Sequence, residues 1–112
     1  MKRIYLSGPI SGKDLDERRQ VFAKVKKAIE EKGYEVFNPM ENGLPHDADT
    51  HQHMYRDLFL LLQSDGIYMM EGWLHSKGCK LEFDVATAIG IDVWFEEAQE
   101  LPASESRIIK FK

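Results

Sequence analysis

The sequence predicts an α/β protein in which helices cover both faces of a parallel sheet of four to five strands, a three-layer α/β/α arrangement. Short apolar segments rich in β-branched and aromatic residues alternate along the chain with segments whose apolar residues recur every three or four positions. Glycine, proline or asparagine stands at most of the boundaries between them. Strands that alternate with helices are joined by right-handed crossovers, and such crossovers place the strands parallel in one sheet.

The first third of the chain provides a strand, a helix and a second strand. Residues 3–7 (RIYLS) are apolar and β-prone, and they stop at a Gly-Pro turn. Residues 14–33 predict a helix, because the apolar side chains fall at helical spacing, and Asp14 with Glu17 suits a capping box at its start. The apolar positions on one face of this helix are Phe22, Val25 and Ile29. Residues 34–39 (YEVFNP) then predict the second strand.

The remaining elements repeat this pattern. We expect a loop at residues 40–49, a helix capped by Asp49 or Thr50, a strand at 65–70, a loop at 71–76, a helix at 76–90 and a strand at 91–95. The helix after residue 49 carries Met54, Leu58, Leu61 and Leu62 on one face. Residues 107–111 (RIIKF) add a fifth strand or swap onto a neighbouring chain. The resulting topology is flavodoxin- or Rossmann-like, in a single domain of residues 1–112.

Composition restricts the class of protein. With 43% hydrophobic and 30% charged residues, the chain is predicted to be a soluble globular domain. Its formal net charge of −4 disfavours a nucleic acid polymer as partner, because proteins that bind such polymers are usually basic. No apolar segment reaches the length of a membrane span, so no membrane association is expected. The single cysteine, Cys79, excludes an internal disulfide and indicates a reducing compartment, the cytoplasm.

Ligand sites of such folds lie beyond the carboxyl ends of the strands, and this rule selects four segments. They follow the four expected strands and read SGPISG (7–12), NPMENG (38–43), EGWLHSKG (71–78) and EEAQ (96–99). In the first, two glycines flank a proline just before a helix, where backbone N–H groups are able to approach an anion. The alternative is a tight turn that requires glycine for its backbone angles alone.

Glu82 is the strongest candidate for chemistry. It stands on the apolar stripe of its helix, three, four and seven positions before Val85, Ala86 and Ile89. A carboxylate in the first turns of a helix is favoured by the helix dipole, so an exposed Glu82 would need no function. Burial of a carboxylate without partners costs several kcal/mol, however, so an inward-facing Glu82 predicts a nearby cleft with hydrogen-bond donors.

Asp57 presents the same problem on the preceding helix. It lies three positions after Met54 and four before Leu61, at the border of the apolar face. It either pairs with Arg56 or a nearby lysine, or it faces the same cleft as Glu82. Two inward carboxylates suit a sugar anomeric centre, where one attacks or stabilises an oxocarbenium-like carbon and the other manages protons.

Other polar and reactive residues fit structural roles better. The segment HDADTHQH holds His46, His51 and His53, but His51 and His53 are two apart and point to different faces of a helix, so no metal is expected. Cys79 reads as a small buried residue, and two tryptophans read as core residues: Trp73 and Trp94. Ser76, in SKG, caps a helix or donates to a phosphate.

Three motifs in this order resemble the nucleoside 2-deoxyribosyltransferase-like superfamily: IYLSGPISG, RDLFLLLQSDGIYMMEGW and SKGCKLEFDVATAIGI. Within it, the sequence is most similar to the DUF4406 family of short bacterial and phage proteins, over roughly residues 3 to 95. The resemblance implies that Glu82 is the nucleophile, that Asp57 of the RD pair takes part in catalysis and that Tyr5 orients Glu82 through its hydroxyl.

The resemblance also implies a substrate-binding set at the two glycine-containing turns: Ser7, Gly8, Pro9, Ile10, Ser11, Gly12, Ser76 and Gly78. In related monophosphate hydrolases a serine six residues before the glutamate binds phosphate, and Ser76 has that spacing. Two positions depart from the pattern. Lys80 stands where relatives often have a second glycine, and Ser11 stands where the nucleotide N-glycosidases often have an arginine.

The expected activity is cleavage or transfer of the N-glycosidic bond of a small-molecule nucleoside or nucleotide, with no cofactor. The alternative is a nucleotide-binding or sensor module, phage-related, that keeps the pocket without turnover. The resemblance further implies a homo-oligomer, either a dimer or a tetramer built from two dimers, with part of a neighbouring chain near Glu82. Candidate interface residues are Phe59, the MEGW segment (70–73) and three tail residues: Ile108, Ile109 and Phe111.

Overall fold

The computed structural model describes residues 2–45 and 47–96, together with the backbone of residues 109–111. The strands are β1 (Arg3–Ser7), β2 (Glu35–Phe37), β3 (Gly66–Met69), β4 (Asp92–Glu96) and β5 (Ile109–Phe111). The helices are α1 (Leu15–Glu30), α2 (Thr50–Leu62) and α3 (Lys77–Ile89), with the short 3-10 turns η1 (Pro39–Glu41) and η2 (Trp73–His75). The predicted alternation of strands and helices is confirmed.

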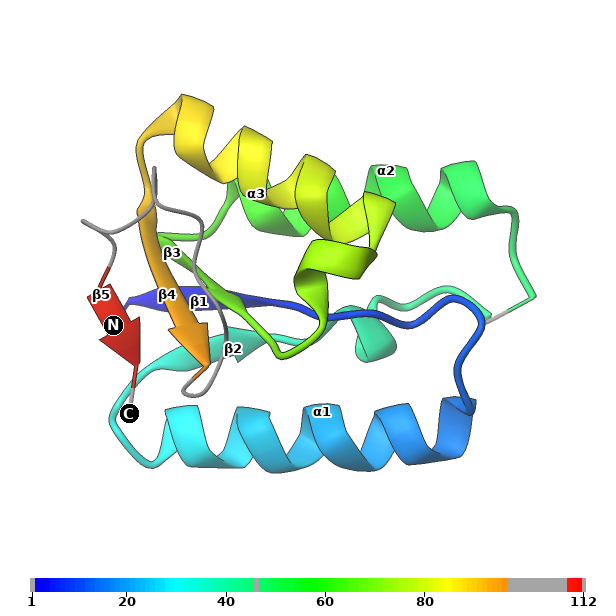
Figure 1. The fold of residues 1–112 in the computed structure, drawn as a ribbon, viewed down its shortest axis with the longest axis horizontal. Helices are drawn as coiled ribbons and strands as arrows, with labels where there is room; N and C mark the ends of the chain where they lie inside the picture. The colour runs from blue at the N-terminus through cyan, green and yellow to red at the C-terminus, as the bar shows by residue number, and fades with distance from the viewer. Residues whose placement is uncertain (1, 46, 97–108, 112) are drawn as a thin grey trace.

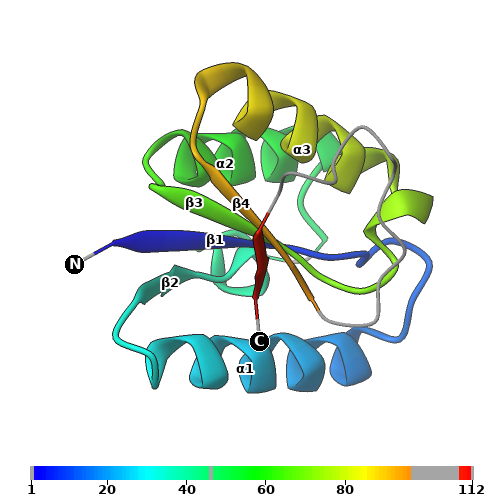
Figure 2. The same cartoon turned by 60° about the vertical axis from the view of Figure 1, so that its left-hand side comes forward.

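The strands form one parallel sheet in the order β2-β1-β3-β4-β5. Helix α1 covers one face of the sheet, and α2 and α3 cover the other, as the views in Figure 1 and Figure 2 show. The three-layer prediction is therefore confirmed, and the tail forms the fifth strand by pairing with β4. The chain moves outward from β1 to β2 and then crosses back to β3, so the order reverses between β1 and β3. Such a reversal is where open α/β sheets bind ligands.

Alternation along the central strand β1 builds two separate cores. Ile4 and Leu6 face α1 and pack with Phe22 and Ile29. Tyr5 faces the opposite layer, where it packs within a cluster formed with residues of α2, β3, η2, α3 and β4: Leu61, Ile67, Met69, Trp73, Cys79, Phe83, Ala86 and Phe95. Both strongly apolar faces of the sheet are thus covered by helices, as a parallel sheet requires.

The helix boundaries have clear causes. The Asp14 side chain accepts from the backbone N–H of Glu17 and caps α1. Asp49, rather than Thr50, caps α2, and it forms a complete capping box with Gln52. Helix α3 ends at Gly90, whose positive φ of 78° is the left-handed conformation that terminates helices.

Two expectations about individual residues need correction. Ile89, the last residue of α3, is exposed although it shares the spacing of the apolar stripe. Met70 and Trp73 are buried and pack in the two cores, so they offer no contact surface to a partner. Ile108 lies outside the described residues. Within the described part of the chain, no helix has the length and hydropathy to cross a membrane.

Candidate active site

Glu82 lies in the first half of α3 and is only 7% exposed. Both of its carboxylate oxygens accept a hydrogen bond from β1: the Tyr5 hydroxyl donates to Oε2 at 2.7 Å, and the Ser7 hydroxyl donates to Oε1 at 2.7 Å. The sequence expectation of a cleft with donors therefore has a specific form, in which two hydroxyls supply the donors. Hydrogen bonds to a carboxylate are among the stronger ones in proteins, and two of them fix the plane of the carboxyl group.

The two donors reach the same carboxylate because of strand geometry. Successive side chains of a strand alternate between faces, so Tyr5 and Ser7 project on the same side of the sheet, toward α3. Strand β1 lies between β2 and β3, and neither donor residue is more than 1% exposed. The Glu82 partners are thus held by a paired central strand rather than by a loop.

Burial dominates the electrostatics of this cluster. Desolvation raises the pKa of Glu82 from 4.5 to about 7, the hydroxyls of Ser7 and Tyr5 counteract part of that rise, and the negative charge of Asp57 adds to it. Burial also raises the pKa of the Tyr5 phenol well above its usual range, and the Glu82 and Asp57 charges contribute in the same direction. Tyr5 is therefore a hydrogen-bond donor at any working pH, and Glu82 changes charge near neutrality.

Asp57 lies on α2 and is held by a different set of partners. The side-chain amide of Asn42 donates to its Oδ1 at 2.9 Å, and the same nitrogen lies 3.0 Å from Nδ1 of His53, one helical turn before Asp57. Burial raises the pKa of Asp57, while the Asn42 amide and then the His53 ring act in the opposite direction. Asp57 therefore pairs with Asn42, and it does not form the alternative ion pair with Arg56.

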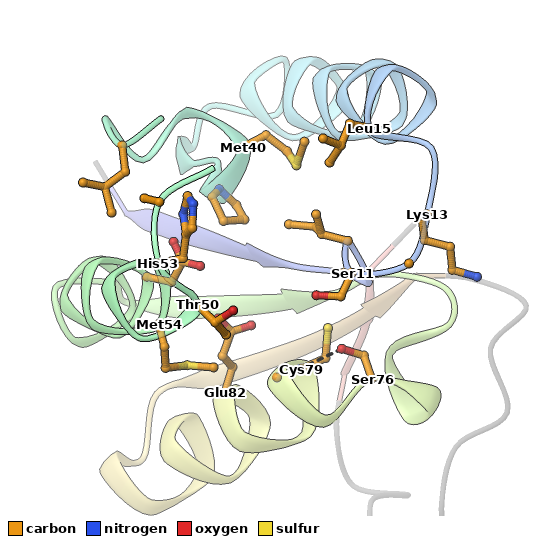
Figure 3. A pocket seen from close by; sticks show the side chains of 18 of the residues that line it. Ser11, Lys13, Leu15, Met40, Thr50, His53, Met54, Ser76, Cys79 and Glu82 are labelled. Carbon is orange, nitrogen blue, oxygen red and sulfur yellow. Dashed lines mark hydrogen bonds between the residues drawn. The ribbon is translucent and has the colours of Figure 1, made fainter. Parts of the chain in front are cut away.

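A pocket of about 450 Å³ opens beside Glu82 and Asp57 at the carboxyl end of the sheet. Its wall comes from the turn after β1, the start of α1, the segment between β2 and α2, the pocket-facing side of α2, and the start of α3. In Figure 3, Glu82, Met54 and His53 border one part of the pocket, while Ser11, Lys13 and Ser76 border another. Lys13 and Arg19 both line the pocket, and Nη1 of Arg19 lies 3.1 Å from Oδ1 of Asp16, with which it forms an exposed ion pair.

The turn after β1 contributes unevenly to the pocket. Gly8, Ile10, Ser11 and Gly12 line it, whereas Ser7 is buried beneath and bonds Glu82. Pro9 faces away, and its carbonyl accepts from Nε of Arg18 at 2.8 Å.

Each glycine of this turn also has a structural reason. A side chain at Gly8 would lie 2.9 Å from Sδ of Met70, and Gly12 has a φ of +76°. The positive φ supports the turn interpretation at Gly12, whereas Gly8 is required by close packing against Met70. Binding of a ligand by the backbone of this turn stays a prediction.

The start of α3 forms the opposite wall. The Ser76 hydroxyl accepts from the backbone N–H of Cys79 at 3.3 Å, so Ser76 is the N-cap of α3 and also lines the pocket. Gly78 and Cys79 line it too, and Cys79 is nearly buried, with its pKa raised by desolvation. A helix N-terminus here adds favourable potential for a negatively charged ligand group.

Sequence reasoning missed Asn42 and placed His53 only in a discounted metal cluster. His53 lines the pocket, and its spacing of four residues from Asp57 on one helix could have identified it. Asn42 has no such signal, because it lies in a segment without periodicity and reaches Asp57 only through the path of the chain after η1. Its side chain was nevertheless in the NPMENG segment that the strand-end rule selected.

The remaining histidine predictions concern a metal. His51 is exposed and lies 3.5 Å from Asp49, whereas His53 faces the pocket, so the two do point to different sides. His46 lies outside the described residues. Among the residues that the structure does describe, no three His, Cys, Asp or Glu side chains come together in a way that could hold a metal ion.

Several solved structures have the same fold as this chain. The 2-deoxyribosyltransferase from the psychrotolerant bacterium Bacillus psychrosaccharolyticus matches with a TM-score of 0.73 at 18% identity, over 98% of this chain and 85% of that one. The 2-desoxiribosyltransferase from Leishmania mexicana matches with a TM-score of 0.68 at 18% identity, over 94% and 70%. A conserved protein from Enterococcus faecalis V583 matches with a TM-score of 0.65 at 26% identity, over 93% and 69%.

These structures share the fold of the chain, and their low identity carries the likeness no further than the fold. No curated protein matches the sequence. The sequence profile of DUF4406, a domain of unknown function, matches residues 2–95. The chain therefore belongs to the DUF4406 family and has the α/β fold of the nucleoside 2-deoxyribosyltransferases.

Proposed function

We propose that the protein cleaves or transfers the N-glycosidic bond of a nucleoside or nucleotide, with Glu82 as the nucleophile. The observation that supports this most directly is the Glu82 carboxylate, buried at the wall of a pocket and held by the hydroxyls of Tyr5 and Ser7. A structural role does not account for it, because an inward-facing carboxylate costs stability that an apolar residue would not. The fold shared with the 2-deoxyribosyltransferases is compatible with the proposal.

In the proposed reaction, one oxygen of ionised Glu82 attacks C1' of the sugar. A bond forms between that oxygen and C1' while the bond from C1' to the base nitrogen breaks, and its electron pair leaves with the base. Asp57, whose pKa is raised by burial, supplies the proton that neutralises the leaving base. Water, or the nitrogen of a second base, then attacks C1', returns a proton to Asp57 and releases Glu82 as carboxylate.

The pocket has the size and polarity for such a substrate. Its volume of about 450 Å³ falls within the range of roughly 300–1,000 Å³ that is common for small-molecule sites. Met40, Leu44 and Met54 supply apolar surface for a flat base, and the turn after β1 with Ser76 supplies polar groups for the sugar. Lys13 and Arg19 at the same pocket offer charge to a 5'-phosphate, so a nucleoside monophosphate is included among the substrates to test.

A nucleotide-binding module without turnover is the second candidate. The observation in its favour is the electrostatics of Glu82, because burial raises its pKa to about 7 and leaves a large share of the carboxyl groups protonated at neutral pH. A protonated carboxyl group is a hydrogen-bond donor to a ligand and a poor nucleophile. Such a module would bind a nucleotide saturably and release no base.

The deciding experiment is a screen of deoxynucleosides and their 5'-monophosphates for free base, with and without an acceptor base. The matched variants are Glu82→Gln, which keeps the shape of the side chain, and Glu30→Gln, which alters an exposed carboxylate of α1. We expect base release from the wild type and Glu30→Gln and none from Glu82→Gln. A 2-fluoro nucleoside with a good leaving group should add its glycosyl mass to Glu82. Undiminished base release by Glu82→Gln would refute the nucleophile assignment.

A further inference from the structure

We infer that Asn42 is a positioning residue that fixes which atoms of Asp57 and His53 face the pocket, and this inference rests on the proposed N-glycosidic chemistry. Asn42 lies between η1 and α2 and is 7% exposed. Its side chain contacts both pocket residues, yet it is not itself part of the pocket wall. It therefore acts on a substrate only through Asp57 and His53.

The orientation of the Asn42 amide is set by the backbone. The N–H of Leu44 donates to Oδ1 of Asn42 at 3.0 Å, so the oxygen of the amide faces the turn. The nitrogen, Nδ2, then faces α2, where it lies 2.9 Å from Oδ1 of Asp57 and 3.0 Å from Nδ1 of His53. A flipped amide would set its oxygen against the Asp57 carboxylate and its N–H₂ group against the Leu44 N–H, which loses both of these hydrogen bonds at once.

This orientation decides where the protons of the neighbours are. The nitrogen of a side-chain amide donates two hydrogen bonds and accepts none from a neighbour. Both Oδ1 of Asp57 and Nδ1 of His53 therefore serve as acceptors. The proton of a neutral His53 ring is therefore on Nε2. A proton held by Asp57 is on Oδ2, because Oδ1 already receives the Asn42 hydrogen.

The consequence for the reaction is a fixed arrangement of two groups. His53 and Asp57 stand four residues apart on α2, and both line the pocket near Glu82 (Figure 3 labels His53 and Glu82). Asp57 transfers its proton from Oδ2 to the leaving base, since the Asn42 contact occupies its other oxygen. The class of substrate that this arrangement recognises is a heteroaromatic base with a ring nitrogen that takes the proton.

The chain contains a matched control for Asn42. Asn38 is also 7% exposed, its Oδ1 accepts from a backbone N–H two residues later, that of Met40, and its Nδ2 donates to a carboxylate. That carboxylate is Glu41, outside the pocket wall. Replacement of either asparagine by aspartate keeps the oxygen that the turn uses and removes the donor nitrogen. Only at position 42 does the loss reach Asp57 and His53.

The kinetic test compares Asn42→Asp with Asn38→Asp. We expect kcat for base release to fall about 10- to 100-fold in Asn42→Asp, below the roughly 10²- to 10⁴-fold effect of removing an acid–base group outright. KM should stay within about twofold, because Asn42 does not contact the substrate. Asn38→Asp should keep both parameters within about twofold of the wild type. Equal kcat values in the two variants, or a loss confined to KM, would overturn the positioning role.

A second measurement needs no substrate, so it separates this inference from the proposed function. Long-range nitrogen–proton NMR spectra of the imidazole rings report which ring nitrogen carries the proton, with His51, which is exposed, as an internal reference. We expect the Nε2–H tautomer for His53 in the wild type and in Asn38→Asp, and a proton on Nδ1 in Asn42→Asp. An Nδ1–H tautomer in the wild type would overturn the positioning role of Asn42 even if base release is found. The expected tautomers, with no base released from any substrate, would support the positioning role of Asn42 and refute the proposed function.

Discussion

The Tyr5 hydroxyl donates to Oε2 of Glu82 at 2.7 Å, across 77 positions of the chain. Ser7 contacts the other oxygen of the same carboxylate at the same distance. Because both donors come from the central strand β1 and the acceptor comes from α3, this contact joins the sheet to the helix layer at the pocket. Most of the testable behaviour of the protein follows from the resulting charge balance at Glu82.

Glu82→Gln should stabilise the protein at alkaline pH and have little effect at acid pH. Burial raises the pKa of Glu82 in the folded state to about 7, against 4.5 for the ordinary group, so the folded protein holds a proton that the unfolded chain has lost. The wild type therefore loses stability as pH rises from 4.5 to about 7, up to about 3 kcal/mol in the free energy of unfolding. Urea unfolding at pH 5 and pH 8 measures this, with Glu30→Gln as control. Equal effects of Glu82→Gln at both pH values would contradict the raised pKa.

The pH dependence of kcat/KM distinguishes the two roles that a carboxyl group can have. A nucleophile must be ionised, so kcat/KM should rise with pH as Glu82 loses its proton, with an apparent pKa near 7. It should fall again at higher pH, where Asp57 no longer holds the proton that the leaving base takes. Because Asp57 influences Glu82, the apparent value belongs to the pair of carboxyl groups. A profile that instead falls through pH 7 would assign Glu82 as a general acid.

Tyr5→Phe and Ser7→Ala should each move the acidic limb of that profile to higher pH. Each hydroxyl lowers the pKa of Glu82 by donating to its ionised form, so removal of either donor leaves the effect of burial less opposed. The same profile for Ser64→Ala provides the control, because Ser64 is a buried serine that donates to the carbonyl of Leu60. An unmoved limb in both pocket variants would mean that the observed ionisation is not that of Glu82.

Asp57→Asn should lower kcat about 10²- to 10⁴-fold and change KM much less, because Asp57 is assigned to proton transfer rather than to binding. The expected loss should be largest for substrates with poor leaving groups, since those depend most on protonation of the base. Steady-state kinetics with a series of bases tests this, with the exposed Asp84→Asn of α3 as control. Normal kcat with weaker binding would remove Asp57 from the chemistry.

The expected homo-oligomer has a specific candidate surface on α2. Tyr55, Phe59 and Leu62 are 73%, 52% and 58% exposed, and their spacing places them along one side of the helix. We expect sedimentation at micromolar concentration to show a dimer or a tetramer, and Phe59→Glu to reduce the assembly to a smaller species. Lys24→Glu on the exposed side of α1 should leave the assembly intact. A fully active wild-type monomer would show that one chain completes its own pocket.

The order of strands and helices was predictable because each element repeats its own period over enough residues to be read locally. The inward position of Glu82 was predictable too, since its place on an apolar stripe left burial with donors as the consistent solution. Alternation along β1 could also have identified Ser7 as a second donor beside Tyr5, although the family resemblance implies a substrate-binding role for Ser7. Asn42 could not be found this way, because its contact with Asp57 depends on the course of an aperiodic segment.

Helix stripes were a less reliable guide to burial. Ile89 has the spacing of a core residue and is nevertheless exposed at the end of α3, so a period marks a side of a helix and not what covers it. The exposed apolar residues of α2 show the same principle, since Phe59 is four residues after Tyr55 and neither is covered by the described residues.

The Glu82 carboxylate and part of the pocket wall lie on separate elements of the fold. Tyr5, Ser7 and Glu82 belong to a paired strand and a helix, whereas Met40, Leu44 and Ala48 of the pocket wall belong to the segment between β2 and α2. Substitution of these three side chains, with the length of the segment and Asn42 retained, should change the preferred base while Tyr5 and Ser7 still hold Glu82. The scaffold is accordingly modular: a library confined to residues 40, 44 and 48 would explore new leaving groups against the same Glu82 contacts, a starting point for enzymes that exchange non-natural bases.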